Sequence, residues 1–194
     1  MARLVARHGP MRISAAPRST ERFASLANAI ASQQLNGRAA ALIWQRVREC
    51  VGEPFSPEAV LTVPFGALRD AGLSGAKARS LLDLAEHVED GRVRLDRIGR
   101  LEDEAVVEQL THVRGIGPWT AQMFLLFTLR RLDVWPVGDF GVRSGYRRAY
   151  GLSELPDPRQ LEQLGEGFRP FRSVAAWYCW RAADDPDVET AERD

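Results

Sequence analysis

The sequence predicts an all-α fold. Apolar residues recur at helical spacing along most of the chain, and capping residues and glycines mark the expected helix ends. No run of four or more residues alternates between apolar and polar side chains, as a half-buried strand would. With 194 residues, 45% of them hydrophobic, the chain is long enough to bury one core or two small cores that share an interface.

The N-terminal half predicts a succession of helices with recognisable ends. A long apolar pattern breaks near Asn36, and both Ser56 and Ser74 stand where a helix N-cap is expected, Ser56 with proline directly after it. Gly72 and Gly91 follow expected helix ends. The expected helices cover 21–49, with a break near residue 36, and then 57–61, 64–71 and 76–88.

The C-terminal half continues in the same way. One helix, 118–131, is apolar on nearly all sides, which is typical of the central helix of a bundle. The other expected helices cover 102–111, 140–150, 158–164 and 173–181.

The most informative segment is the turn Gly115-Ile-Gly117 between two expected helices. Glycine permits positive φ and a close approach of the backbone to another molecule. The second helix begins at Pro118, which needs no hydrogen-bond partner for its nitrogen in the first turn. Because the start of this helix presents unpaired N–H groups, the turn predicts a cradle for one phosphate.

Charge is unevenly distributed along a chain whose formal net charge is zero. Between Leu110 and Tyr150, six arginines stand against two aspartates, a net charge of +4, whereas the segment 184–194 holds six acidic residues and one arginine. A basic region with a distant acidic tail favours phosphate binding, with a salt-bridged solvated surface as the alternative.

The cysteine content argues against several kinds of site. Cys50 and Cys179 are too few for a disulfide framework, for a four-thiolate zinc site or for a four-cysteine iron–sulfur cluster. Both lie in apolar helical patterns, which favours simple packing. We therefore expect no metal site built from side chains.

Several motifs, in order and spacing, resemble those of the helix-hairpin-helix (HhH-GPD) DNA glycosylase superfamily, in its alkylpurine branch, the bacterial 3-methyladenine DNA glycosylase II group. The hairpin lies within about 110–122, and an aspartate follows about twenty residues later in Pro136-Val-Gly-Asp139. The other matching motifs are Ile30-Ala-Ser-Gln33-Gln34-Leu35, Gly72-Leu-Ser-Gly-Ala-Lys77 and Arg172-Ser-Val-Ala-Ala-Trp177-Tyr-Cys-Trp180.

This resemblance implies an architecture and an activity. It implies a central helical subdomain over 29–135 that contains the hairpin, a second subdomain formed by 1–28 and 136–194, and an active-site cleft between them. The implied activity is hydrolysis of the N-glycosidic bond of alkylated purines in base excision repair. The longer bacterial enzymes carry an N-terminal β-rich domain, for which too few residues precede the first expected helix, so their substrate range is not carried over.

Asp139 is the expected catalytic residue. A purine alkylated at N3 or N7 is already cationic and leaves readily, so the remaining need is to stabilise positive charge on the sugar, which a nearby carboxylate can do while it orients a water. An aspartate before a helix is also a common N-cap, a role compatible with catalysis because a cap fixes the direction of the carboxylate.

The resemblance also assigns residues to the extruded nucleotide and to the DNA. Base flipping leaves a gap in the stack, which a side chain after the first helix fills; Gln34, with Leu35 beside it, is in that position, although an ordinary loop role remains the alternative. Stacking on a cationic base suits an aromatic ring. The assigned base contacts are Trp119, Trp180 and Gln33, and the assigned DNA contacts are Gln34, Leu35, Gly115, Gly117, Thr120 and Arg143.

The lysine content bears on strand cleavage. Glycosylases that cut the strand use an amine to form a Schiff base with the sugar. In the superfamily this lysine stands two residues after the second hairpin glycine, where this chain has Trp119, and the only lysine of the chain is Lys77. We therefore expect a monofunctional enzyme that acts through water, leaves an abasic site and needs no cofactor, apart from a monovalent cation that main-chain carbonyls of the hairpin could hold.

Three other functions fit the sequence less well. A passive DNA clamp would not need Asp139 with two tryptophans, a glycosylase for oxidised or mismatched bases is disfavoured by the missing lysine and cysteine cluster, and a structural scaffold would leave the hairpin unexplained. We expect the partner to be double-stranded DNA with alkylated bases. No stretch approaches the roughly 20 apolar residues of a membrane span, and the start lacks the apolar run of a secretory signal, so we expect the bacterial cytoplasm, where the chromosome lies. We also expect a monomer without an obligate protein partner.

Overall fold

The computed structural model describes residues 1–186, and within them every regular element is a helix. This confirms the predicted all-α fold for that part of the chain. Of the acidic segment 184–194, residues 187–194 lie outside the described residues. The chain divides into two compact units, one over Ala16–Leu129 and one formed by Met1–Ala15 with the chain from Arg130 onward.

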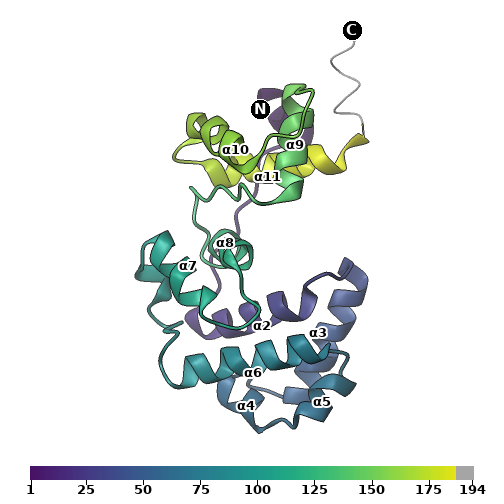
Figure 1. Cartoon of the computed structure of the whole chain (residues 1–194), viewed down its shortest axis with the longest axis vertical. Helices are drawn as coiled ribbons and strands as arrows, with labels where there is room; N and C mark the ends of the chain where they lie inside the picture. The colour runs from purple at the N-terminus through teal and green to yellow at the C-terminus, as the bar shows by residue number, and fades with distance from the viewer. Residues whose placement is uncertain (187–194) are drawn as a thin grey trace. The chain divides into compact units, whose positions relative to one another are not determined.

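The unit Ala16–Leu129 is built around α2 and α6, which lie side by side (Figure 1). Leu26 and Ile30 of α2 and Leu81 and Leu84 of α6 are almost completely buried, as their helical spacing predicts. The helices of this unit are α2 (Arg22–Ser32), α3 (Gly37–Val51), α4 (Pro57–Thr62), α5 (Phe65–Asp70), α6 (Gly75–Glu89), α7 (Asp103–Thr111) and α8 (Pro118–Phe127), with 3-10 turns η1 (Ser19–Glu21) and η2 (Ile98–Arg100).

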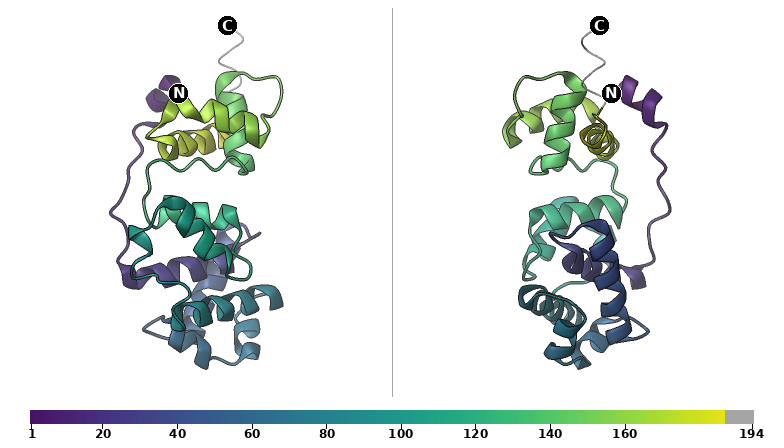
Figure 2. Two further views of the ribbon diagram at one scale, coloured as in Figure 1. Left: turned by 60° about the vertical axis from the view of Figure 1, so that its left-hand side comes forward. Right: turned by 90° about the vertical axis from the view of Figure 1, so that its right-hand side faces the viewer.

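The other unit is organised by the close packing of α9 on α11. At their crossing, a Cβ atom on Gly145 would lie 1.7 Å from the carbonyl oxygen of Cys179, so only glycine fits there. Leu4 of the N-terminal helix packs on Tyr178 of α11, and Figure 2 shows this purple helix beside the yellow one. The helices are α1 (Ala2–His8), α9 (Phe140–Tyr150), α10 (Pro158–Gly165) and α11 (Arg172–Asp184), with the 3-10 turn η3 (Glu166–Phe168).

The predicted helix starts at serine are confirmed. The hydroxyl of Ser56 accepts a hydrogen bond from the N–H of Ala59, and the hydroxyl of Ser74 accepts one from the N–H of Lys77. Each bond satisfies a donor that the first turn of a helix leaves unpaired.

The largest differences from the sequence prediction are one helix end and one additional helix. The apolar helix expected over 118–131 ends at Phe127, because the N–H of Leu129 turns back to the carbonyl of Phe124 and Arg130 takes a left-handed conformation with φ 59°. Helix α1 was not expected. It has only seven residues, a length that is marginal in isolation, and it is held by the burial of Leu4.

The boundaries of the units also differ from those expected for the subdomains. The unit that carries the hairpin begins at Ala16 and ends at Leu129, whereas the resemblance implied 29–135. The earlier start follows from the packing of α2 on α3 and α6, which places the whole of α2 in this unit. The division into functional subdomains stays a prediction.

Candidate functional site

Asp139 lies at the N-terminus of α9 and is held by two donors on one oxygen. Its Oδ1 accepts a hydrogen bond of 2.8 Å from the N–H of Val142, which makes it the N-cap of the helix, and another of 2.8 Å from the indole Nε1 of Trp180. The residue is buried, with 9% of its surface exposed. The carboxylate is therefore fixed in direction from both α9 and α11.

Glycine in the first turn of α9 makes this arrangement possible. A Cβ atom on Gly141 would lie 2.7 Å from Cδ1 of Trp180 and 3.1 Å from Oδ1 of Asp139. The indole therefore occupies space that only a glycine leaves open. The resemblance assigned Trp180 to the base, and in the structure its indole N–H donates to the carboxylate of Asp139. Stacking of this ring on the base stays a prediction.

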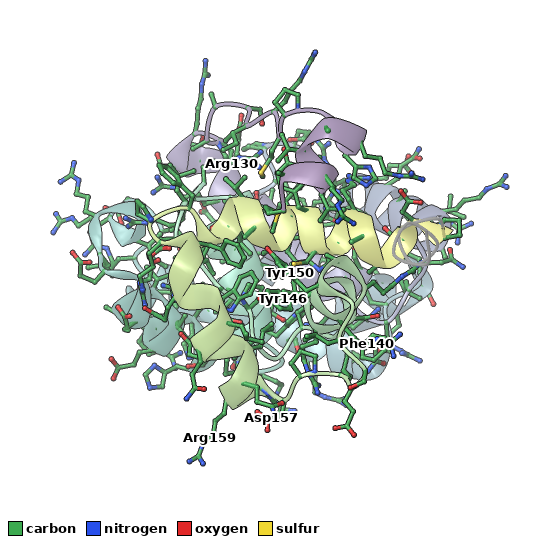
Figure 3. All side chains as sticks on the ribbon, turned by 90° about the horizontal axis from the view of Figure 1, so that it is seen from above. Arg130, Phe140, Tyr146, Tyr150, Asp157 and Arg159 are labelled. Carbon is green, nitrogen blue, oxygen red and sulfur yellow. The ribbon has the colours of Figure 1, made fainter. Side chains whose placement is uncertain are left out.

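Phe140, directly after Asp139, is an aromatic residue that was not predicted to belong to the site. It is 69% exposed, the largest exposure among the exposed large hydrophobic side chains, and Figure 3 labels it at the start of α9. Farther along the helix, Tyr146 and Tyr150 stack with ring centroids 4.4 Å apart (Figure 3), and burial raises the pKa of Tyr146 to about 12. The signal that could have found Phe140 is an aromatic side chain in the first turn of a helix, where it has no preceding turn to pack on.

In the other unit, the hairpin packs against side chains of α6. Gly115 has φ 77°, and a Cβ atom there would lie 2.4 Å from the hydroxyl oxygen of Ser80. The N–H of Arg114 donates to Oδ2 of Asp83 at 2.7 Å. Gly117 differs from the expectation of positive φ, because it has φ −94° and is the N-cap of α8 with open space around it.

The first turn of α8 presents one assigned side chain to solvent and buries another. Trp119 is 48% exposed, which is consistent with an accessible ring. Thr120 is buried, so its predicted contact with DNA depends on its backbone N–H rather than on its hydroxyl. Both assignments stay predictions.

The loop after α2 carries Gln33, which the resemblance assigns to the extruded base, and Gln34 and Leu35, which it assigns to the gap left in the DNA stack. The Nε2 of Gln33 donates a hydrogen bond of 2.9 Å to the carbonyl of Gly115, so this side chain is engaged with the hairpin. Gln34 is exposed and has φ 57°, a left-handed conformation that is uncommon outside glycine. Leu35 is also exposed. Their predicted roles in base flipping are untested by these contacts.

Part of the basic region has structural partners. The Nε of Arg143 donates to the carbonyl of Pro156 at 2.7 Å, and Arg148 donates to the carbonyls of Ala183 and Asp185 at the end of α11. The two arginines thus hold connections within their unit. The assignment of Arg143 to DNA stays a prediction.

We searched the described residues for groups of side chains that could bind a metal ion and for helices that could span a membrane. Within residues 1–186 there is no group of three or more histidine, cysteine or acidic residues that could hold a metal ion, and no helix there is long and apolar enough to cross a membrane. Two hairpin carbonyls are already hydrogen bonded, that of Val113 by the N–H of Ile116 and that of Gly115 by Gln33. The cation at the hairpin stays a prediction.

Comparison with known families gives one match over most of the chain. The sequence pattern described as "HhH-GPD superfamily base excision DNA repair protein" matches residues 27–170. Among curated relatives, DNA-3-methyladenine glycosylase 1 of Schizosaccharomyces pombe is 35% identical over 184 residues, which cover 93% of this chain and 81% of the relative.

Solved structures give the same answer. The structure of the Schizosaccharomyces pombe 3-methyladenine DNA glycosylase Mag1 in complex with abasic DNA is similar with a TM-score of 0.85 and 35% identity, covering 96% of this chain and 92% of that one. A DNA-3-methyladenine glycosidase from Bacillus halodurans is similar with a TM-score of 0.80 and 36% identity, covering 98% and 89%.

Proposed function

The chain belongs to the HhH-GPD superfamily of base excision DNA repair proteins, and we infer that it is a 3-methyladenine DNA glycosylase that removes alkylated bases from DNA. The observation that carries the chemistry is the carboxylate of Asp139, oriented through Oδ1 by the N–H of Val142 and the indole of Trp180. A passive clamp has no need of a buried carboxylate fixed in this way.

The proposed reaction breaks the bond between C1′ of the sugar and the nitrogen of the purine. Both electrons of that bond leave with the cationic base, which becomes neutral, and positive charge develops on the sugar. Asp139 stabilises this charge electrostatically, and water adds to C1′ and loses a proton, which leaves an abasic site and a free base. No protonation of the leaving base is required, because the alkyl group has already made it cationic.

Access to the base requires extrusion of its nucleotide from the duplex. The exposed Gln34 and Leu35 are suited to fill the gap, and the exposed ring of Trp119 is suited to stack on the extruded base. In the other unit, Phe140 follows Asp139 in the sequence and is also an exposed aromatic residue. We propose that alkylated purines, 3-methyladenine and 7-methylguanine among them, are preferred because a cationic ring gains more from such stacking than a neutral one.

We propose that the enzyme is monofunctional. The position two residues after Gly117 holds Trp119, which cannot form a Schiff base. The amine of Lys77, the only lysine, donates hydrogen bonds to the carbonyls of Ala31 and Gln33. Monomeric action on duplex DNA in the bacterial cytoplasm completes the proposal.

The test uses duplex DNA treated with a methylating agent and measures released purines by chromatography. We expect release of methylpurines by the wild type, and a loss of about 100-fold or more for Asp139→Asn, because the amide keeps the cap but loses the negative charge. Affinity for duplex DNA should be retained. Strand integrity on a denaturing gel should be unchanged until the abasic sites are cleaved by alkali.

Asp157→Asn is the matched control. Asp157 caps α10 as Asp139 caps α9, with its Oδ1 accepting from the N–H of Gln160, and it lies in the same unit (Figure 3). This variant should release bases within about twofold of the wild type, as expected for a surface substitution that preserves its hydrogen bond. Absence of base release from every alkylated substrate by the wild type would contradict the enzymatic function, whereas full activity of Asp139→Asn would contradict only the role of Asp139.

A further inference from the structure

The amine of Lys77 lies at the C-terminal end of another helix. Its Nζ donates a hydrogen bond of 2.9 Å to the carbonyl of Ala31 and one of 2.6 Å to the carbonyl of Gln33. These carbonyls belong to the last turn of α2 and the loop after it, where carbonyls lack helical partners and a positive charge is favourable. Lys77 therefore binds across the unit to the loop that carries Gln34.

This contact is unusual for a lysine. Lys77 occupies the first turn of α6, where the helix dipole disfavours a positive charge, and burial lowers the pKa of its ammonium group. Both effects oppose a cation at this position, so the two short hydrogen bonds must offset them. A lysine that served only as a surface charge would stand on the exposed side of the helix, as Arg79 does.

The loop that Lys77 holds has a strained backbone. Gln34 lies between the carbonyl of Gln33 and the N-cap of α3, and its φ of 57° is in the left-handed region, which is unfavourable for a residue other than glycine. Such conformations persist only where surrounding contacts fix them. Lys77 fixes the residue before Gln34 through its hydrogen bond to the carbonyl of Gln33. The residue after Gln34 is also fixed, because the N–H of Leu35 donates to the carbonyl of Ser32 at the end of α2.

The same loop is joined to the hairpin. The side chain of Gln33 donates a hydrogen bond to the carbonyl of Gly115. Two side chains of α6, one and two turns after Lys77, also reach the hairpin. The hydroxyl of Ser80 lies against Gly115, and the carboxylate of Asp83 accepts a hydrogen bond from the N–H of Arg114. One helix thus supports both the strained loop and the hairpin, and Gln33 connects the two directly.

We propose that Lys77 is a positioning residue for base extrusion, which sets the loop of Gln34 in a fixed position relative to the hairpin so that gap filling and backbone grip act as one rigid element. The proposal rests on the proposed function, since it concerns the same DNA. Lys77 acts through the loop and does not touch the reacting atoms. Both of these acceptors are backbone carbonyls, so Lys77 is placed to hold the loop rather than to attack the sugar.

The test compares Lys77→Met with Lys77→Arg and with Arg79→Met, which removes the same charge from an exposed position of the same helix. Affinity is measured by fluorescence anisotropy for a duplex with a tetrahydrofuran abasic analogue and for the matched undamaged duplex. Insertion into the gap is followed by 2-aminopurine placed next to the analogue, and the melting temperature of each variant is recorded.

We expect Lys77→Met to lose about tenfold in its preference for the tetrahydrofuran duplex, together with the 2-aminopurine signal, because a displaced loop misplaces the filling side chain. Affinity for undamaged DNA should stay within about twofold, since Lys77 is not a phosphate contact in this proposal. Lys77→Arg should restore most of the preference, because a guanidinium can donate to both carbonyls.

Gln33→Ala keeps the proposal testable if Lys77→Met does not fold, because it breaks only the half-exposed link to Gly115 and should cause a loss of the same sign. Full preference in a folded Lys77→Met, or an equal loss in Arg79→Met, would overturn the proposal. If Lys77→Met does not fold, full preference in Gln33→Ala would overturn it. The readout does not depend on base release. An enzyme that discriminates the abasic analogue through Lys77 but releases no methylpurine would contradict the proposed function and leave this inference standing.

Discussion

The two units of the molecule differ in which groups are candidates for function and in which groups hold them in place. In Ala16–Leu129 the candidate groups are backbone N–H groups and a loop, and side chains of α6 hold them in place. In the unit that begins again at Arg130 the candidate group is a side chain, Asp139, and a backbone N–H and an indole hold it. From this difference we expect substitutions around the hairpin to lower DNA affinity, and substitutions around Asp139 to lower the rate of base release.

The crossing of α9 and α11 gives the largest expected effect. In Gly145→Ala the new methyl group would overlap the carbonyl of Cys179, and since backbone atoms cannot give way locally, the helices must separate. We expect a loss of about 3 kcal/mol in the free energy of unfolding, measured by urea denaturation. Gly167→Ala, in the same unit with open space around it, is the control and should unfold close to the wild type. Equal stability of the two variants would mean that the crossing accommodates a methyl group at Gly145 without separation of the helices.

The indole of Trp180 gives the next effect. Trp180→Phe keeps an aromatic face but removes the hydrogen bond to Asp139, so we expect kcat for base release to fall about tenfold with little change in KM. In the Asp139→Asn background the same change should have almost no further effect, because the two residues act as one unit. Trp177→Phe, on the same helix, should retain wild-type kcat. A rise in KM alone for Trp180→Phe would instead favour the stacking role that the sequence predicts.

The hairpin gives the smallest expected effect and the sharpest test of the comparison. In Gly115→Ala the φ of 77° and the hydroxyl of Ser80 both oppose a methyl group, so we expect affinity for undamaged duplex DNA to fall about fivefold. Gly117→Ala should lose less, because its φ of −94° suits any residue and the space is open. Anisotropy titrations at fixed salt measure both. If the order of the two variants were reversed, the phosphate would lie closer to Gly117 than its geometry indicates.

The helices were largely predictable because local signals mark their ends. Ser56, Ser74 and Asp139 each cap a helix, and the break before Gly37 separates α2 from α3 as expected. Helix α1 was missed because its stability comes from Leu4 packing on α11, a contact between residues far apart in the chain.

The sequence indicated features of the candidate site that depend on one residue, but not those that depend on a pair. The N-cap role of Asp139 was expected and is confirmed, whereas its hydrogen bond with Trp180 joins residues 41 positions apart. The catalytic role of Asp139, which the resemblance implied, stays a prediction. The contact of Lys77 with Gln33 spans 44 positions, and nothing in the local sequence around Lys77 indicates it. Such pairs are set by how helices pack, so they become visible only in three dimensions.

The absence of a side chain at Gly145 has a consequence for how this enzyme can change. Cys179, whose carbonyl oxygen meets Gly145, directly precedes Trp180, and Gly145 stands in the same helix that Asp139 caps. The register of the two helices is therefore fixed by a backbone contact that no compensating side chain can rebuild. Directed evolution toward a new lesion should then leave α9 and α11 untouched and select variants in the loops and exposed aromatic rings around them.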